Sequence, residues 1–237
     1  MFAIRVNRAA AILGAIFLAC APASSSTRGA ESTASSAPNA TAPAKVSAAP
    51  TDPEIARADL ARIMGDSAAK TWVIVISDFQ CPYCKQWHDE TYPAFRDEYV
   101  KPGKVRFAYV NYPLNSHQNA WPTAYAAMCA AAQGKFWEMH DALFATQAQW
   151  EVMTAPKPLL DSLAASLKLD VKRWSDCVDS GKMKSLIQAD HDRALAAGAV
   201  STPTFLIGGG MVVGAVPIAD MRKAVDSAIA KAGKSSR

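Results

Sequence analysis

The sequence predicts an α/β fold in which a small mixed sheet is interrupted by an all-helical insertion. The run Thr71–Ser77 is short, continuous and rich in β-branched apolar residues, which is typical of a buried central strand. Residues 114–198 contain helical patterns and no convincing strand. Strands resume late, because Thr204–Ile207 and Met211–Val213 flank a glycine turn and predict a hairpin.

Composition and charge limit the classes of function. The chain has 237 residues, of which 50% are hydrophobic and 19% are charged, so it can bury one core with an added lobe. The formal net charge of +4 includes Arg5 and Arg8 near the start of the chain. The remainder is close to neutral, which gives no reason to expect a nucleic-acid partner.

The first 20 residues have the order of a signal peptide, with bases first, then the apolar run Ala9–Ala19, then small residues. The apolar run is too short to span a bilayer. Two cleavage interpretations stay open: Phe17–Cys20 resembles a lipobox with lipid on Cys20, and Ala19–Ala23 contains ordinary signal peptidase sites. Either removal or lipidation of Cys20 leaves four cysteines that can pair, as an oxidising compartment favours. We therefore expect an exported protein of the periplasm or cell envelope, anchored to the membrane if Cys20 carries lipid.

The rest of the chain divides by composition and periodicity. Residues 21–51 are rich in Ala, Ser, Thr and Pro and predict a disordered linker, because they cannot bury enough apolar surface to offset the entropy of ordering. We assign 52–113 and 199–232 to the sheet domain, 114–198 to the helical insertion and 233–237 to a disordered tail. Helices are expected at Pro53–Met64 behind an Asp52 cap, Ala120–Ala132, Phe136–Ala145, Leu159–Leu167, Val171–Val178, Met183–Ala197 and Ile218–Ile229.

The sequence Cys81-Pro82-Tyr83-Cys84 lies between the first strand and a helix. Proline suits the first helical position, so Cys81 becomes the N-cap, where free amides and the helix dipole favour a thiolate. Cys81 is therefore the expected nucleophile, and Cys84, one turn further along, the less exposed resolving thiol. Pro82 and Tyr83 would tune the stability of the thiolate.

A metal site or a purely structural crosslink are the other interpretations of this cysteine pair. A structural zinc site usually has four ligands, and the sequence contains no second CxxC and no HxxxH. His117, His140 and His191 also lack the spacing of metal ligands. We thus expect no metal, and no cofactor other than a redox-active disulfide.

A proline directly before the strand Thr204–Ile207 is a second signal. The Thr202-Pro203 pair either starts an edge strand or contains a cis peptide bond. Together with a CxxC upstream, it matches the loop that faces the active-site cysteines in thioredoxin-like proteins and binds substrate backbone.

Three segments then resemble one known family. Ser77–Cys84, Gly134–His140 and Gly198–Phe205 look like the DsbA-like branch of the thioredoxin superfamily, over roughly residues 70–230. The resemblance implies a thioredoxin-like fold with an inserted all-helical domain, thiol-disulfide oxidoreductase activity at Cys81 and Cys84, and a cis bond before Pro203.

The direction of electron flow stays open. The dipeptide is Pro-Tyr rather than the Pro-His of the strongly oxidising enzyme, and Thr202 stands where that enzyme has Val. We expect a monomeric oxidase of exported proteins that is reoxidised by a membrane partner. The alternatives are a reductase or isomerase of the same compartment, and a peptide-binding or chaperone module with a structural disulfide.

Four further residues have two interpretations each. Cys129 and Cys177 lie in separate predicted helices and either form a second disulfide or remain buried thiols. His88 is a solvated helix residue or a proton shuttle. Asp78, which follows the first strand, is a solvated acid or an influence on proton transfer at Cys84. We favour the disulfide, the solvated histidine and the solvated acid.

Overall fold

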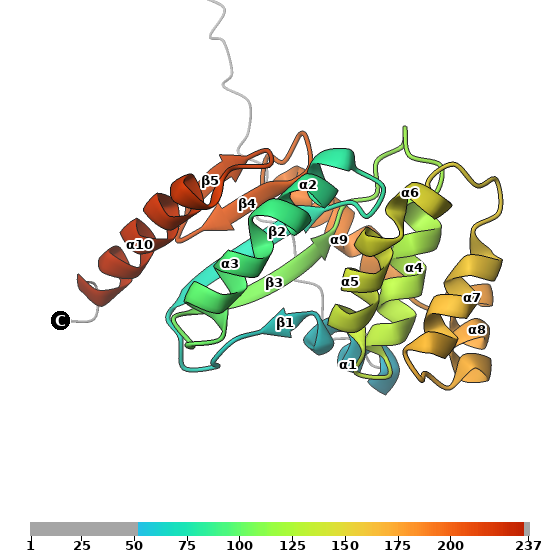
Figure 1. Ribbon diagram of the computed structural model, residues 1–237. Coiled ribbons are helices and arrows are strands. Elements are labelled where there is room, and N and C mark those ends of the chain that lie inside the picture. The colour runs from blue at the N-terminus through green and yellow to red at the C-terminus, as the bar shows by residue number, and fades with distance from the viewer. Residues whose placement is uncertain (1–51, 235–237) are drawn as a thin grey trace, which may run out of the picture. The chain divides into compact units, whose positions relative to one another are not determined.

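The computed structural model describes residues 52–234 of the protein (Figure 1). The predicted signal peptide, the linker and the lipidation candidate Cys20 lie outside the described residues.

A five-stranded mixed sheet forms the centre of the described part, in the order β1-β3-β2-β4-β5. The central strand β2 runs parallel to β3 and antiparallel to β4, while β1 and β5 pair antiparallel at the two edges. The strands are β1 (Ile63–Met64), β2 (Thr71–Ser77), β3 (Val105–Asn111), β4 (Thr204–Ile207) and β5 (Gly210–Val213).

Helices precede, follow and interrupt the sheet. Pro93 lies in the first turn of a short helix after a break at Thr91, and a π-helical turn follows it. The helices are α1 (Pro53–Ala61), α2 (Pro82–Glu90), α3 (Tyr92–Phe95), the π-turn η1 (Arg96–Val100), α4 (Ala120–Ala131), α5 (Phe136–Ala145), α6 (Gln147–Trp150), α7 (Lys157–Ser166), α8 (Val171–Asp179), α9 (Lys184–Ala196) and α10 (Ile218–Lys234).

Different helices cover the two faces of the sheet. On one face, Trp87 of α2 packs against Phe205 of β4, with ring centroids 4.8 Å apart, and α10 lies beside α3. On the other face, Ile76 of β2 clusters with Ala194 of α9. The helix α9, which the sequence assigned to the insertion, therefore serves as a covering layer of the sheet.

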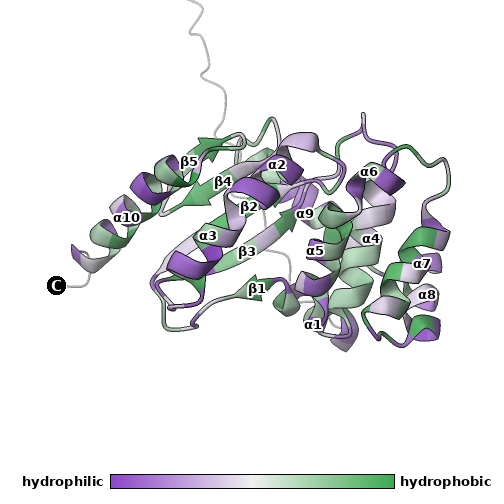
Figure 2. Ribbon diagram, in the orientation of Figure 1, coloured by the Kyte–Doolittle hydropathy of each residue, from purple (hydrophilic) through white to green (hydrophobic). Residues whose placement is uncertain are grey.

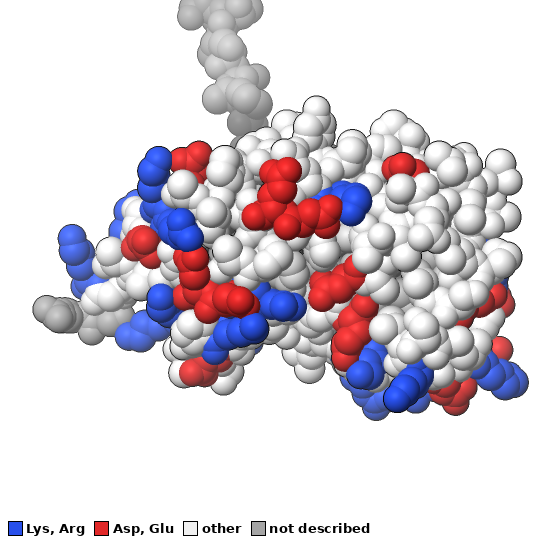
Figure 3. All heavy atoms as spheres, viewed as in Figure 1, with Lys and Arg blue, Asp and Glu red and all other residues white. Residues whose placement is uncertain are grey.

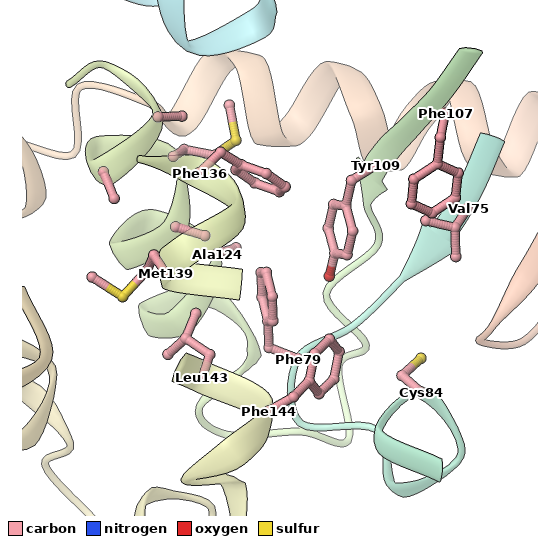
Figure 4. Close-up of a cluster of buried hydrophobic side chains, with 14 of the residues drawn as sticks. Val75, Phe79, Cys84, Phe107, Tyr109, Ala124, Phe136, Met139, Leu143 and Phe144 are labelled. Atoms are coloured by element: carbon pink, nitrogen blue, oxygen red, sulfur yellow. The ribbon is translucent and has the colours of Figure 1, made fainter. Parts of the chain in front are cut away.

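The sheet and the helical lobe share one hydrophobic core. Phe79, just after β2, stacks on Tyr109 of β3 at 5.0 Å and meets Phe144 of α5 at 5.3 Å (Figure 4). Apolar residues concentrate on the strands and on the inner sides of the helices, and polar residues lie on the outer sides (Figure 2). Burial of this continuous apolar surface holds the lobe against the CxxC end of β2.

Most predicted elements are present, but two helices end at other residues than predicted and one short helix was missed. The first helix ends at Ala61 rather than Met64, because Ile63–Met64 pair with β3. The last helix continues to Lys234, past Ile229 and into the predicted tail. The short helix α6 was not predicted. The first difference arises from pairing with a strand that is distant in sequence, which local periodicity does not report.

A buried ion pair joins three elements behind the sheet. Arg62, directly after α1, donates to the carboxylate of Asp190 in α9 and, at 3.2 Å, to the carbonyl of Tyr109. The same carboxylate accepts the side-chain amide of Asn111 at 2.9 Å. Arg62 is 6% exposed and Asp190 is fully buried. Removal of Asp190 leaves Arg62 with only the partly exposed Asp59 as an ion-pair partner, so the buried side of the guanidinium loses its counter-charge.

We expect Asp190→Ala to lower the free energy of unfolding by about 3 to 5 kcal/mol, because Arg62 would lose its buried partner. Asp192→Ala on the same helix is the matched control, since the Asp192 side chain is 64% exposed and its loss should cost less than about 0.5 kcal/mol. Urea unfolding followed by circular dichroism measures both. Equal effects of the two substitutions would contradict a structural role for the buried pair.

Candidate active site

The CxxC motif occupies the junction between β2 and α2. Cys81 is the N-cap of α2 with extended backbone angles (φ −69°, ψ 124°), and Pro82 takes the first helical position. This is the register that the sequence predicted, because proline has a preset helical φ and no N–H to leave unpaired. The helix therefore directs its first amides towards the sulfur of Cys81.

Both cysteines are free thiols and both are shielded from solvent. Cys81 is 4% exposed and Cys84 is 2% exposed, whereas Tyr83 between them is 62% exposed. The Thr202-Pro203 peptide bond is cis, and its loop lies directly over the nucleophile. The thiol of Cys81 donates to the carbonyl of Thr202 at 3.4 Å. The fold thus brings together the two sequence motifs that were expected to meet.

The pKa of the Cys81 thiol is lowered to about 6. The largest cause is a hydrogen bond from the Cys84 thiol, and the hydroxyl of Thr202 and the amides of Cys84 and Tyr83 add to it. Burial opposes the shift without cancelling it. Cys81 makes no side-chain cap hydrogen bond in the thiol form, and the Thr202 Oγ1 atom is buried without a partner among the described residues. These donors are therefore free to bind the thiolate.

The pKa of Cys84 shifts in the opposite direction. Burial raises it well above the usual value, and the hydrogen bond to the Cys81 sulfur raises it further. Two thiols one helical turn apart thus differ in protonation at neutral pH, one as a thiolate and one as a proton donor. That division suits a nucleophile and its resolving partner.

The helical lobe fixes the backbone of the active-site loop. Gln147 of α6 donates to the carbonyl of Phe79 at 2.6 Å and to that of Cys81 at 3.2 Å. Gln80 accepts the amide of Asn119 at 2.7 Å. Sequence reasoning missed Gln147 and Asn119. Their sequence context, a polar residue near an aromatic helix end, is shared by many unrelated sequences.

Asp78 is buried, so its interpretation as a solvated acid was wrong. It is 2% exposed, and burial raises its pKa. Its carboxylate accepts the amide of Gln80 at 2.8 Å, the amide of Leu114 at 3.0 Å and a ring nitrogen of His117 at 2.7 Å. Asp78 therefore connects the loop that carries Cys81 to the segment that follows β3.

The interpretation of His88 as a solvated residue was also wrong. Its ring lies 4.8 Å from that of Phe144 and contacts the carboxylate of Asp141 at 3.2 Å. The hydrogen bond to Asp141 joins α2 to α5 of the lobe.

Figure 3 shows charged side chains of both signs over α2 and α3, while the upper surface beside α6 carries little charge.

The other cysteine pair lies within the lobe. Cys129 of α4 and Cys177 of α8 form a disulfide with a Cα–Cα distance of 5.8 Å. The residues are 1% and 7% exposed. This crosslink joins two helices that carry none of the CxxC machinery.

We expect the alkylation rate of the reduced protein to rise with pH around a midpoint near 6, because only the Cys81 thiolate reacts. Thr202→Val removes the hydroxyl that stabilises the thiolate, so the midpoint should move upward. Thr204→Val is the control, because the Thr204 hydroxyl bonds the carbonyl of Ser201 instead. Iodoacetamide labelling with mass spectrometry at each pH measures the midpoint. An unchanged midpoint in Thr202→Val would remove this residue from the site.

Comparison with known sequences supports one family. Residues 58–227 match the family model described as Thioredoxin. The probable disulfide bond formation protein D of Bacillus anthracis is 27% identical, over 71% of this chain and 78% of that protein.

A second relative matches only in part. The Na(+)/H(+) antiporter NhaA 3 of Salinispora tropica is 35% identical over 77% of this chain. The chain spans only 26% of the antiporter's length, and within residues 52–234 no helix has the length and apolarity to cross a bilayer.

Solved structures support the same fold. BdbD from Bacillus subtilis superposes with a TM-score of 0.66 at 21% identity, over 71% of this chain and 92% of that one. The alpha-DsbA1 of Wolbachia pipientis gives 0.67 at 20% identity, over 74% and 94%. With the family match, these findings assign the chain to the thioredoxin family, with a fold similar to that of the DsbA proteins.

Proposed function

We propose that this protein is an exported dithiol oxidase, which introduces disulfides into other exported proteins through Cys81 and Cys84. The opposite pKa shifts of the two thiols carry the proposal. A stabilised Cys81 thiolate favours the reduced enzyme, and an enzyme with a stable reduced form is an oxidant of its substrates.

The first step begins from the Cys81–Cys84 disulfide. A substrate thiolate attacks the Cys81 sulfur, a substrate–Cys81 disulfide forms, and the Cys81–Cys84 bond breaks. Cys84 leaves with the electron pair and takes up a proton, because its buried environment disfavours the thiolate.

The second step releases the product. A second substrate thiolate attacks the substrate sulfur of the mixed disulfide, and Cys81 leaves as a thiolate. Two electrons have then passed from the substrate thiols to the enzyme. The Cys84 thiol, the Thr202 hydroxyl and the helix amides stabilise the departing Cys81 sulfur. A membrane partner would complete the cycle by reoxidising the pair.

The Thr202-Pro203 loop is the proposed binding site for the substrate backbone. It lies against the nucleophile, with the carbonyl of Thr202 3.4 Å from the sulfur. Tyr83, inside the CxxC, is 62% exposed, and Val200, two residues before Thr202, is 86% exposed. Exposed apolar side chains next to a reactive centre suit unfolded chains, which present apolar residues and free thiols.

Reduction or isomerisation is the second candidate, and one observation favours it. A pKa of about 6 for Cys81 is closer to the value of about 7 in thioredoxin than to the value of about 3.5 in DsbA. A weaker preference for the thiolate corresponds to a less oxidising enzyme. The name of the Bacillus relatives, disulfide bond formation protein D, supports the oxidase.

Location and partners follow from the same proposal. A signal peptide at residues 1–20 would place the protein in the periplasm or cell envelope, and lipid on Cys20 would anchor it. The proposed partners are exported substrate proteins and a membrane redox protein, with the enzyme itself a monomer. Ion transport is not part of the proposal, because the match covers only 26% of the antiporter.

We expect Cys84→Ser to accumulate mixed disulfides with exported proteins, because Cys81 can still bond to them but no resolving thiol remains. Cys81→Ser is the matched variant and should accumulate none. Non-reducing gels of both variants, with and without dithiothreitol, measure the adducts. A lack of adducts in both variants would favour a peptide-binding module whose cysteines only crosslink the fold.

The direction of electron flow is tested by equilibrium with glutathione. An oxidase should have a reduction potential above about −200 mV, in the range where a dithiol donates its disulfide to substrates. Mass spectrometry of the alkylated protein gives the ratio of dithiol to disulfide. A potential well below that value would instead identify a reductase.

A further inference from the structure

We propose that His88, His140 and Asp141 form a binding site for a divalent transition-metal ion such as Zn²⁺. His88 lies in the last turn of α2, and the other two lie in the middle of α5. Their ligand atoms all lie within 4.8 Å of one another. Sequence spacing gave no sign of this site, because His88 and Asp141 are 53 residues apart.

Two of the three ligand distances are short enough for one shared ion, and the two histidine nitrogens lie within 4.8 Å of each other. Asp141 Oδ1 lies 3.2 Å from His88 Nε2 and 2.8 Å from His140 Nδ1. Ligand atoms that surround a tetrahedral zinc at about 2.0 to 2.2 Å are separated by about 3.3 to 3.6 Å, so small shifts of the side chains would accommodate the ion. Two imidazoles and one carboxylate are also a donor set that zinc and its neighbours in the first transition row prefer.

Two carboxylates face the ring of His88. Its Nε2 faces Asp141 and its Nδ1 faces Asp89 Oδ1 at 3.0 Å. A neutral imidazole carries one N–H, and a carboxylate only accepts, so a neutral His88 satisfies one of these contacts and not both. A metal ion on Nε2 is compatible with both contacts, because Nδ1–H then donates to Asp89.

The surrounding groups are arranged for this role. A metal-bound histidine usually donates its second nitrogen to a carboxylate, which is the place of Asp89. Lys85 pairs with the other oxygen of Asp89 at 2.7 Å. Arg96 lies 3.8 Å from Asp141 Oδ2 and leaves Oδ1 for the ion. The carboxylates of Asp89 and Asp141 thus each keep one oxygen directed to the site.

Aromatic packing holds the site in place. His140 is 2% exposed, and its ring lies 5.1 Å from that of Trp137 and 5.1 Å from that of Phe144. The ring of His88 packs 5.2 Å from that of His140. Side chains fixed by packing bind a metal with little loss of rotamer freedom. A bound ion would link α2, one turn after Cys84, to the lobe.

The competing occupant is a second proton on His88, and zinc binding separates the two. The experiment uses the full chain with the Cys81–Cys84 disulfide formed. Cys20 is alkylated, so that no thiolate can bind the metal. Isothermal titration with Zn²⁺ should show one ion per chain. His88→Gln and Asp141→Asn should abolish this binding, and Asp89→Asn should weaken it about 10-fold, because Asp89 orients the ring of His88.

His191→Gln is the matched control, because His191 is also partly buried beside an aspartate and lies on α9. It should bind Zn²⁺ like the wild type. Co²⁺ in place of Zn²⁺ should give the visible spectrum of a nitrogen and oxygen site without thiolate charge transfer.

Two results would overturn the proposal: no saturable binding by the wild type, or binding of equal strength in His88→Gln. His140→Gln is left out as a deciding variant, because its burial makes a folding defect hard to separate from ligand loss. None of these outcomes depends on the disulfide exchange proposed above.

Discussion

The hydrogen bond between the two CxxC sulfurs is the interaction on which the site depends. It is the largest cause that lowers the pKa of Cys81, and it also raises the pKa of Cys84. The bond exists because a proline starts α2 at the end of a buried strand, which puts one sulfur at the helix mouth and the other inside the core. Helix geometry and burial therefore act together, and neither alone would separate the two pKa values so far.

The lobe is more than an insertion beside a thioredoxin-like sheet. Its helix α9 covers one face of the sheet, and α6 bonds the carbonyls of the active-site loop. A shared aromatic core around Phe79 joins the two parts. The proposed metal site adds a contact at the opposite end of α2, so both ends of the active-site helix meet the lobe.

Local signals predicted much of this arrangement. The β-branched run at Thr71–Ser77, the proline after Cys81 and the proline after Thr202 each determine the backbone over a few residues, so their consequences are visible in the sequence. The burial of Asp78 and the packing of His88 could not be predicted from the sequence. Both depend on which distant segment covers them, and a single sequence carries no record of that. For the same reason, the sequence predicted a helix over Ile63–Met64, which is an edge strand in the structure.

The hydrogen bond from Gln147 to the carbonyl of Cys81 limits the insertions and deletions that the helical lobe can accept. Insertions in a helical lobe are usually tolerated when they fall in connections. Here a change in length between α5 and α6 would rotate the side-chain amide of Gln147 away. The turn that contains Cys81 would then lose two hydrogen bonds to its carbonyls. If this lobe were grafted onto another thioredoxin-like sheet, Gln147 and its position on the helix would have to be kept. Otherwise the grafted protein would have the same fold, but the backbone at the nucleophilic cysteine would not be held in place.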